Sequence, residues 1–206
     1  SKFAISANSA TSCLTLALGA LDIEPGDEVI VPCMSYIASA TAILTYNAIP
    51  VFCEVDENTY CIDINDLKKK ISKKTKALML VHVLGISTDM DKLLKILNKN
   101  KIILVEDACE SIGAKYKNKF LGTFGEFATF SFYFSHQISS IEGGMICCKN
   151  KEDENIIKSL RSHGWAKGLS NQKKIENKFK KINKNFLFIN SGFNLRPTDI
   201  QAAIGL

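Results

Sequence analysis

Short apolar segments alternate along the chain with longer segments in which apolar residues recur every three to four positions. The short segments predict β-strands and the longer ones predict amphipathic helices. The predicted strands are Glu28–Pro32, Pro50–Glu54, Ala77–His82, Ile102–Glu106, Phe127–Phe132 and Gly144–Cys148, and the predicted helices lie near residues 10–21, 35–46, 63–73, 89–99 and 152–162. This alternation predicts an α/β fold with a mainly parallel sheet and helices on both of its faces.

Three segments interrupt this pattern. Pro25-Gly26-Asp27 predicts a turn, and Tyr116-Lys117-Asn118-Lys119 predicts the tip of a hairpin. Residues 166–185 are polar and rich in lysine, without a clear period. We expect this last segment to be a surface loop or a partly disordered insertion rather than a second domain.

The two ends of the sequence carry regular patterns of their own. Residues 1–6 have the pattern of a strand that leads into a polar motif, and residues 200–206 have an apolar helical pattern. The length of 206 residues suits one large domain. We therefore expect residues 1–206 to be a single large domain from the interior of a longer protein.

Composition and charge narrow the possible partners. The net charge is +5, and its lysines gather at residues 68–74 and 167–184. No aromatic residues alternate with the first cluster, so we expect a solvated helix face and no nucleic-acid binding. No signal-peptide pattern and no apolar run of about 18 residues are visible in the sequence, so we expect no membrane association.

The seven cysteines match neither a zinc-ligand spacing nor a disulfide framework, and most lie within apolar segments. An odd number of cysteines of this kind indicates a reducing compartment. We therefore expect no metal centre and a cytoplasmic protein.

Polar residues follow several of the predicted strands. Four clusters lie at such strand ends: Asn8–Thr11, Ser35-Tyr36, Asp107–Glu110 and Ser131–His136. Ligand sites of open α/β sheets lie at the carboxyl ends of the strands, so we expect the four clusters to converge at one edge.

Taken residue by residue, the chemistry of these clusters stays open. The turn at Asn8–Thr11 precedes a helix, so it could hold a phosphate or simply cap the helix. The Asp107 carboxylate could pair with a protonated ring nitrogen or form a cap or salt bridge. A lone histidine such as His136 is more often a packing or surface residue than a catalytic one.

Two motifs decide between these alternatives. The segment Thr129–Gly144 and the tetrad Val105-Glu106-Asp107-Ala108 resemble the cofactor pocket of the DegT/DnrJ/StrS family. The resemblance to the family extends from Ile5 to Leu206, and residues 160–165 and 192–197 resemble the branch of it that carries histidine in place of the usual lysine. The family consists of pyridoxal-phosphate (PLP) enzymes that modify nucleotide-linked sugars. The resemblance implies the large domain of a fold-type-I PLP enzyme, with a sheet of the seven-stranded type and a separate C-terminal small domain outside this sequence.

The resemblance also assigns residues to the cofactor. Ala10, Thr11 and Ser131 match positions that contact the phosphate, and Tyr36 matches the aromatic residue that stacks on the ring. Asp107 matches the aspartate at the pyridine nitrogen, and Glu110 occupies a place often held by glutamine. Asn194 matches an asparagine that reaches the cofactor phosphate of the neighbouring subunit, which implies a homodimer with shared active sites.

His136 stands where the family normally has a lysine, and no lysine lies between Lys119 and Lys149. Imidazole cannot form the Schiff base that a lysine forms, but its ordinary pKa of about 6.5 suits proton transfer. One branch of the family carries histidine and removes the C3 hydroxyl of 4-keto-6-deoxy sugars with pyridoxamine phosphate (PMP). Relatives can carry a histidine at the next position as well or instead, and here that residue is Gln137.

The resemblance therefore predicts dehydration of a nucleotide-linked 4-keto-6-deoxy sugar at C3, with His136 as the base. Glutamate is the expected amino donor that regenerates PMP, and the expected pathway is the synthesis of a surface polysaccharide. Two alternatives stay open: a sugar-nucleotide aminotransferase that works without the usual lysine, and a non-catalytic homologue that binds the cofactor or the sugar.

Overall fold

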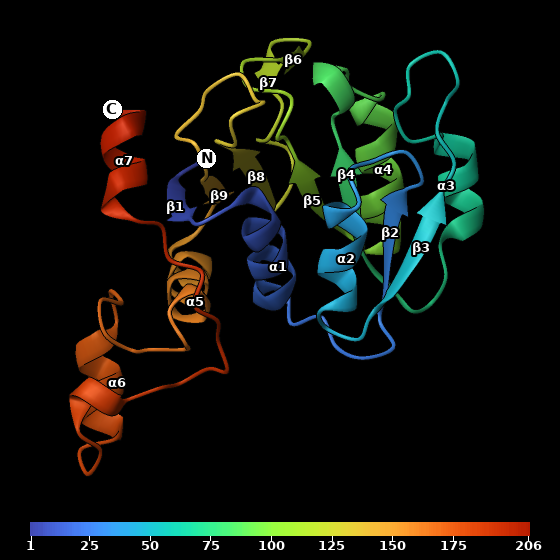
Figure 1. The fold of residues 1–206 in the computed structure, drawn as a ribbon. Helices are drawn as coiled ribbons and strands as arrows, with labels where there is room; N and C mark the ends of the chain where they lie inside the picture. Colours follow the sequence, from blue (N-terminus) through green and yellow to red (C-terminus); the bar gives the residue numbers. More distant parts are fainter.

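A seven-stranded sheet organises the chain in the computed structural model, which describes residues 1–206 (Figure 1). Its strands are β1 (Phe3–Ala7), β2 (Glu28–Pro32), β3 (Ile49–Cys53), β4 (Thr75–Val81), β5 (Ile103–Asp107), β8 (Phe127–Ser131) and β9 (Gly144–Cys148). All six strands predicted from the pattern are present, and their bounds differ from the predicted ones by at most two residues.

The sheet is mainly parallel, as predicted. The strand order is β1-β9-β8-β5-β4-β2-β3. β2 pairs in parallel with β3 and β4, and β5 pairs in parallel with β4 and β8. Only β9 runs against the others, since it pairs antiparallel with both β1 and β8. The carboxyl ends of the other six strands therefore meet at one edge, together with the first residue of β9.

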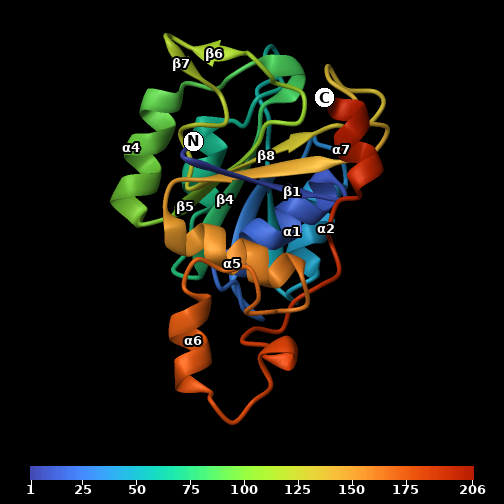
Figure 2. The same ribbon diagram turned by 90° about the vertical axis from the view of Figure 1, so that its left-hand side faces the viewer.

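Helices cover both faces of this sheet. They are α1 (Ala10–Ala20), α2 (Ala38–Leu44), α3 (Ile64–Lys70), α4 (Met90–Asn100), α5 (Lys151–Arg161), α6 (Gln172–Lys178) and α7 (Asp199–Gly205), with short 3₁₀ turns η1 (Val83–Gly85) and η2 (Lys184–Phe186). α1 packs against α2 and α5 on one face, and α3 and α4 pack together on the other (Figure 2). The α/β fold with two helical layers is therefore confirmed.

Each helical layer encloses its own core. The larger core lies under α1, α2 and α5 and contains 23 buried residues, and the smaller one lies under α3 and α4. α1 is buried around most of its circumference, because it lies between the sheet and two other helices. α4 is amphipathic instead: Asp89 caps it, and Met90, Leu93 and Leu97 face the sheet.

The predicted hairpin is present as β6 (Lys115–Tyr116) and β7 (Lys119–Phe120), which pair antiparallel. The prediction for residues 166–185 was wrong in one respect, because residues 172–178 form the helix α6. This helix has no apolar stripe and no buried residue, so its sequence shows no helical period. Local pairs such as Gln172 Nε2 to Glu176 Oε1, at 2.7 Å, stabilise it instead.

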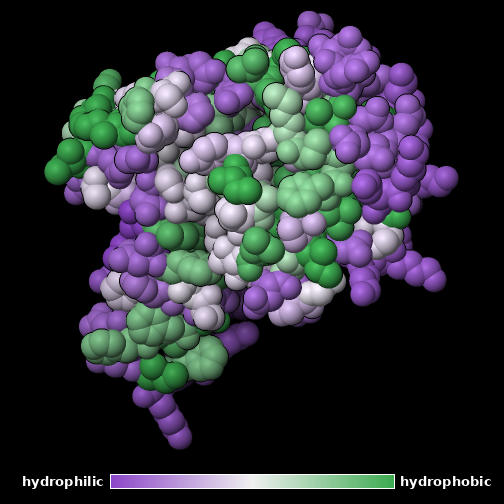
Figure 3. Space-filling view, turned by 45° about the vertical axis from the view of Figure 1, so that its right-hand side comes forward, coloured by the Kyte–Doolittle hydropathy of each residue, from purple (hydrophilic) through white to green (hydrophobic).

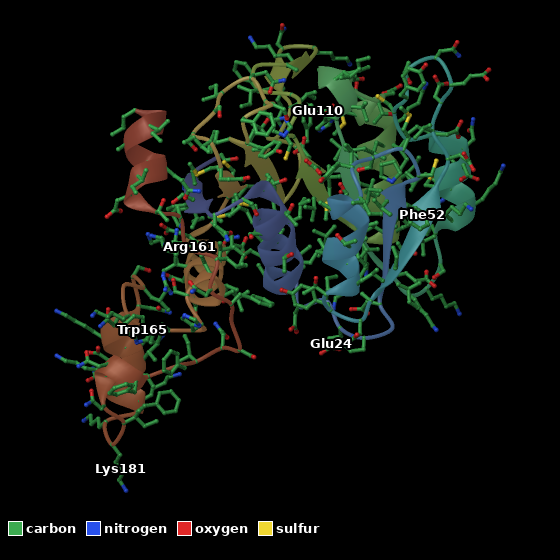
Figure 4. The ribbon with its side chains drawn as sticks, in the orientation of Figure 1. Glu24, Phe52, Glu110, Arg161, Trp165 and Lys181 are labelled. Atoms are coloured by element: carbon green, nitrogen blue, oxygen red, sulfur yellow. The ribbon has the colours of Figure 1, made fainter.

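Residues 166–190 extend away from the sheet (Figure 1). Apolar side chains gather on this extension, at the lower left of Figure 3, and they include the exposed Phe179, Phe186 and Phe188. Lys181 lies at its tip (Figure 4). The lysines and the aromatic residues of this segment therefore share one protruding part of the molecule.

Further features bear on the class of protein. None of the helices combines the length and the apolar character that a bilayer crossing requires. No three histidine, cysteine, aspartate or glutamate side chains are grouped as a metal site would need. All seven cysteines are unpaired.

Candidate active site

A cavity of about 710 Å³ opens at the edge where the parallel strands end. This volume lies in the range of pockets that hold small molecules and cofactors. Its walls come from the start of α1, the segments after β2, β4 and β5, and the connection between β8 and β9. Glu110 marks this edge of the sheet in Figure 4. The predicted convergence of the four polar clusters is therefore confirmed.

Seven of the eight predicted site residues line this cavity: Ala10, Thr11, Tyr36, Asp107, Glu110, Ser131 and His136. Asn194 does not line it. Its side chain is exposed, and its backbone forms an isolated bridge with Ser162 at the end of α5. The position of Asn194 is thus open to a second molecule, as its predicted role requires.

The start of α1 forms one wall. The Ser9 side chain caps the helix by accepting a hydrogen bond from the Ser12 N–H group, at 3.1 Å. The N–H groups of Ala10 and Thr11 belong to the first turn, so they have no acceptor within the helix. Together with the helix dipole, they suit a phosphate group.

Gly144 allows β9 to approach this turn. A Cβ atom at Gly144 would lie 2.4 Å from the Ser9 carbonyl carbon and 2.6 Å from the Ala10 nitrogen. Any side chain there would collide with backbone atoms. The second glycine of the Glu-Gly-Gly motif is therefore required by the close packing of β9 against the start of α1.

Asp107 forms the floor and is almost fully buried. Its Oδ2 atom accepts a hydrogen bond from the Ser39 hydroxyl at 3.0 Å, and Ser39 in turn accepts one from Ser35 at 2.8 Å. These bonds fix the carboxylate in one orientation. Ser39 lies in the first turn of α2 and Ser35 lies in the segment before this helix, and Ser39 was not identified as a site residue from the sequence.

Glu106 lies on the opposite side of β5 and braces a turn. Its two oxygens accept hydrogen bonds from the N–H groups of Gly122, Phe124 and Gly125 and from His82 Nε2, at 2.6–2.9 Å. Burial by itself raises the pKa of Glu106, but the bonds from His82 and the backbone outweigh it and hold the pKa below its ordinary value of 4.5. Glu106 and His82 therefore have a structural task.

His136 lies in the connection between β8 and β9, half-buried, with its ring edge toward Tyr133 at 6.3 Å between ring centroids. Its backbone N–H group donates to the Tyr133 carbonyl at 3.0 Å. Gln137 does not line the cavity, and its side-chain amide donates to the Glu110 carbonyl at 2.8 Å. Of the two neighbours, His136 is the one placed to act on a ligand.

The lining is acidic. It contains the carboxylates of Asp107, Glu110 and Glu142 but no lysine and no arginine. One Glu110 oxygen accepts from the Leu84 N–H group at 2.8 Å. Burial, followed by the nearby Asp107 charge, raises the pKa of Cys109, so this thiol stays protonated.

Several further lining residues were not named individually as site residues, although Ser9, Ser35, Cys109, Tyr133 and Ser135 lie within the four polar clusters of the sequence. They are Ser9, Leu14, Met34, Ser35, Ala38, Val81, Val83, Cys109, Tyr133, Ser135, Glu142 and Gly143. Glu142 and Gly143 belong to a motif that the sequence did single out. Val81 and Val83 carry no such signal, because apolar residues at the end of a buried strand look the same whether or not they face a cavity.

Two parts of the cavity lining suit the two polar groups of a phosphorylated pyridine. The unpaired N–H groups of α1, beside the space that Gly144 leaves free, suit the phosphate. The buried, oriented carboxylate of Asp107 suits a protonated ring nitrogen. Tyr36 lies at the mouth with 79% of its surface exposed, so a ligand can cover it.

The sequence profile of the DegT/DnrJ/EryC1/StrS aminotransferase family matches residues 1–206. GDP-4-keto-6-deoxy-D-mannose 3-dehydratase from Escherichia coli O55:H7 is 36% identical over 214 residues, which cover all of this chain and 55% of the relative. GDP-perosamine synthase from Caulobacter vibrioides is 40% identical over 205 residues, which cover all of this chain and 51% of the relative. The chain thus spans about half the length of these relatives.

Solved structures that resemble this chain include 3-dehydratases as well. The E. coli GDP-4-keto-6-deoxy-D-mannose-3-dehydratase with bound hydrated PLP matches with a TM-score of 0.91 and 36% identity, over all of this chain and 55% of the other. A second structure of a GDP-4-keto-6-deoxymannose-3-dehydratase contains a trapped PLP-glutamate geminal diamine and matches with a TM-score of 0.91 and 35% identity, over the same shares. The predicted fold type, family resemblance and PLP cofactor are confirmed.

Proposed function

Because this chain belongs to the DegT/DnrJ/EryC1/StrS aminotransferase family, we propose that residues 1–206 are the large cofactor-binding domain of an enzyme that modifies a nucleotide-linked 4-keto-6-deoxy sugar. The reaction is removal of the C3 hydroxyl, with PLP and PMP as the forms of the cofactor. Similarity to a 3-dehydratase in both sequence and structure supports this proposal.

One observation carries the choice of reaction: the cavity lining contains a histidine and no lysine. A side chain that forms a Schiff base must be a primary amine, and the lining offers none. The His136 imidazole can accept and donate a proton without forming a covalent bond. The site is thus suited to moving protons on a ligand that is held without a covalent link.

Each wall residue has a separate task in this proposal. When bound, the cofactor supplies an electron sink. The N–H groups of Ala10 and Thr11, with the Ser131 hydroxyl, hold its phosphate, and Tyr36 covers its ring. The Asp107 carboxylate, oriented by Ser39, keeps the ring nitrogen protonated. His136 takes the proton from the bound ligand and returns a proton to the departing C3 hydroxyl, which leaves as water.

The charge of the cavity supports a homodimer. A cofactor phosphate and a nucleotide diphosphate are both anionic, whereas the lining supplies three carboxylates and no lysine or arginine. Cations must therefore come from outside this lining. The Asn194 amide of a second subunit is uncharged, but it would add a hydrogen-bond donor for the phosphate, and the exposed position of Asn194 is compatible with that task.

Transamination is the second candidate. The 40% identity to a GDP-perosamine synthase and the name of the family favour it. The chemical objection is the missing lysine, because a transaminase uses a base for its proton shift and an amine to release the product. Glutamate serves as the amino donor in both proposed reactions, and a PLP-glutamate adduct in a solved relative supports this choice.

The deciding experiment incubates the full-length protein with PLP, glutamate and a GDP-linked 4-keto-6-deoxyhexose, and analyses the sugar by mass spectrometry. Loss of the 3-hydroxyl supports dehydration, and a stable amino sugar supports transamination. Absence of turnover, with the cofactor still bound, supports a non-catalytic homologue.

The variant His136→Gln should lower kcat at least about 100-fold, since general-base catalysis contributes roughly that factor, and an unchanged kcat would remove His136 from the mechanism.

We place this reaction in the cytoplasm and in the synthesis of a surface polysaccharide. Seven unpaired cysteines suit a reducing compartment. A related Bacillus subtilis protein is described as a spore coat polysaccharide biosynthesis protein, at 34% identity over the whole chain. Detection of the deoxygenated sugar in the polysaccharide of the producing cell, and its loss on deletion of the gene, would test this assignment.

A further inference from the structure

The segment that carries His136 has little to hold it in place. Residues 133–139 lie between β8 and β9, and the side chains of Phe134 and Ile138 are 67% and 50% exposed. They therefore contribute little burial that would fix the segment. Its Tyr133 ring lies beside the rings of Phe134 and His136, with centroids 4.3 and 6.3 Å away.

Hydrogen bonds within the segment are local. The Tyr133 N–H group donates to the Ser131 hydroxyl at 3.2 Å, and the His136 N–H group donates to the Tyr133 carbonyl at 3.0 Å. Such bonds close small turns, but they do not fix the turns against the rest of the protein.

Only one hydrogen bond joins the connection between β8 and β9 to a part of the chain other than these two strands. The Gln137 Nε2 atom donates to the Glu110 carbonyl oxygen at 2.8 Å. Glu110 follows β5 directly and is itself tied to η1, because its carboxylate accepts from the Leu84 N–H group at 2.8 Å. Gln137 thus joins the His136 segment to the same strand end that carries Asp107.

We infer that Gln137 is a positioning residue for His136. This inference rests on the proposed function, in which His136 moves protons on a ligand whose ring is held at Asp107. Since Asp107 and Glu110 belong to one short segment, the Gln137–Glu110 bond sets the distance between the base and the ligand. The Gln137 amide thereby holds His136 in position and does not itself transfer a proton.

The test removes the donor while keeping the length of the side chain. In the full-length protein, Gln137→Met should raise the rate of amide hydrogen exchange in residues 133–139 by about fivefold to tenfold, the equivalent of one net hydrogen bond. The matched control is Gln172→Met, which removes an amide donor from α6 on the extension. It should leave exchange in residues 133–139 unchanged. Equal exchange in the wild type and Gln137→Met would overturn the inference.

A kinetic measurement separates positioning from general destabilisation. Gln137→Met should lower kcat by about the same fivefold to tenfold, with the KM for the nucleotide sugar and the melting temperature nearly unchanged. Gln137→His can donate from its ring and should recover part of the kcat. A Gln137→His enzyme faster than the wild type would assign the base to position 137 and refute the inference.

The exchange measurement does not depend on turnover. If the wild type shows no dehydration, the proposed function fails, while the exchange rates still decide whether Gln137 holds the segment.

Discussion

Glu106 and Asp107 are neighbours in β5 with opposite tasks. Successive side chains of a strand point to opposite faces, so Asp107 faces the cavity and Glu106 faces the turn at residues 122–125. The Asp107 carboxylate lines the cavity, where a ligand can reach it. Both oxygens of the Glu106 carboxylate accept hydrogen bonds from protein donors. The stability of the fold therefore depends on whether Glu106 is ionised.

The variant Glu106→Gln should lower the free energy of unfolding at pH 7 by about 2–4 kcal/mol, because an NH₂ group would face backbone donors that then lose their acceptor. The folded-state pKa of Glu106 is lowered, so its stabilisation is present above its ordinary value of 4.5 and is lost as the pH falls through the folded value. The difference in unfolding free energy between the wild type and Glu106→Gln should therefore become smaller as the pH is lowered from 7 to 3.

Urea unfolding of the full-length protein at both pH values measures this difference. Glu24→Gln is the control, because Glu24 is an exposed carboxylate on a loop (Figure 4), and it should change the unfolding free energy little. A difference for Glu106→Gln that grows toward low pH would contradict the expectation.

At the scale of elements, the site depends on how closely β9 lies against the start of α1. The Cβ atom of Gly144→Ala would lie 2.4 Å from backbone atoms of Ser9, so β9 and the turn must separate. We expect a loss of about 1–3 kcal/mol in unfolding free energy, the usual range for overpacking, and weaker PLP binding.

Equilibrium unfolding and PLP titration of the full-length protein check this expectation. Gly205→Ala adds the same methyl group on α7, where the nearest atom is the Ser140 Cβ at 3.7 Å. This control should bind PLP as the wild type does. Unchanged PLP affinity in Gly144→Ala would show that the phosphate-binding wall tolerates the separation.

The periodic patterns predicted these elements well, because strands and amphipathic helices bury one regular set of positions. They failed at α6, since a helix that buries nothing leaves no period in the sequence. The resemblance to a family supplied seven of the residues that line the cavity. It did not supply Ser39 or the bond from Gln137 to Glu110, because both depend on which side chains meet across different elements.

At the scale of the whole molecule, charge is distributed unevenly. Residues 166–190 contain seven lysines and one glutamate, a net charge of +6, so the other residues together carry −1. The net positive charge of this chain therefore lies on the protruding extension, whereas its cavity is lined by carboxylates. This separation agrees with a site that is completed by another subunit.

A mixing experiment tests whether active sites are shared. Asn194→Ala and His136→Gln should each be inactive alone. After the subunits are exchanged in equal amounts, half of the dimers contain one of each, and one of their two sites is intact. About a quarter of the wild-type activity should then return, as the symmetry of a two-fold dimer requires. Dehydratase assays of the mixture measure it, and no recovery after proven exchange would exclude sites shared through Asn194.

The direction of β9 has a consequence for how this protein can evolve. Because β9 returns antiparallel beside β8, residues 132–143 connect two strands whose ends are already paired, Ser131 with Gly144. The ladder fixes both ends of the connection, and few of its side chains are buried. Mutations inside it therefore alter reactivity at little expense to folding. The residue type at position 136 can be exchanged within a lineage, and a new reaction can arise on an unchanged scaffold.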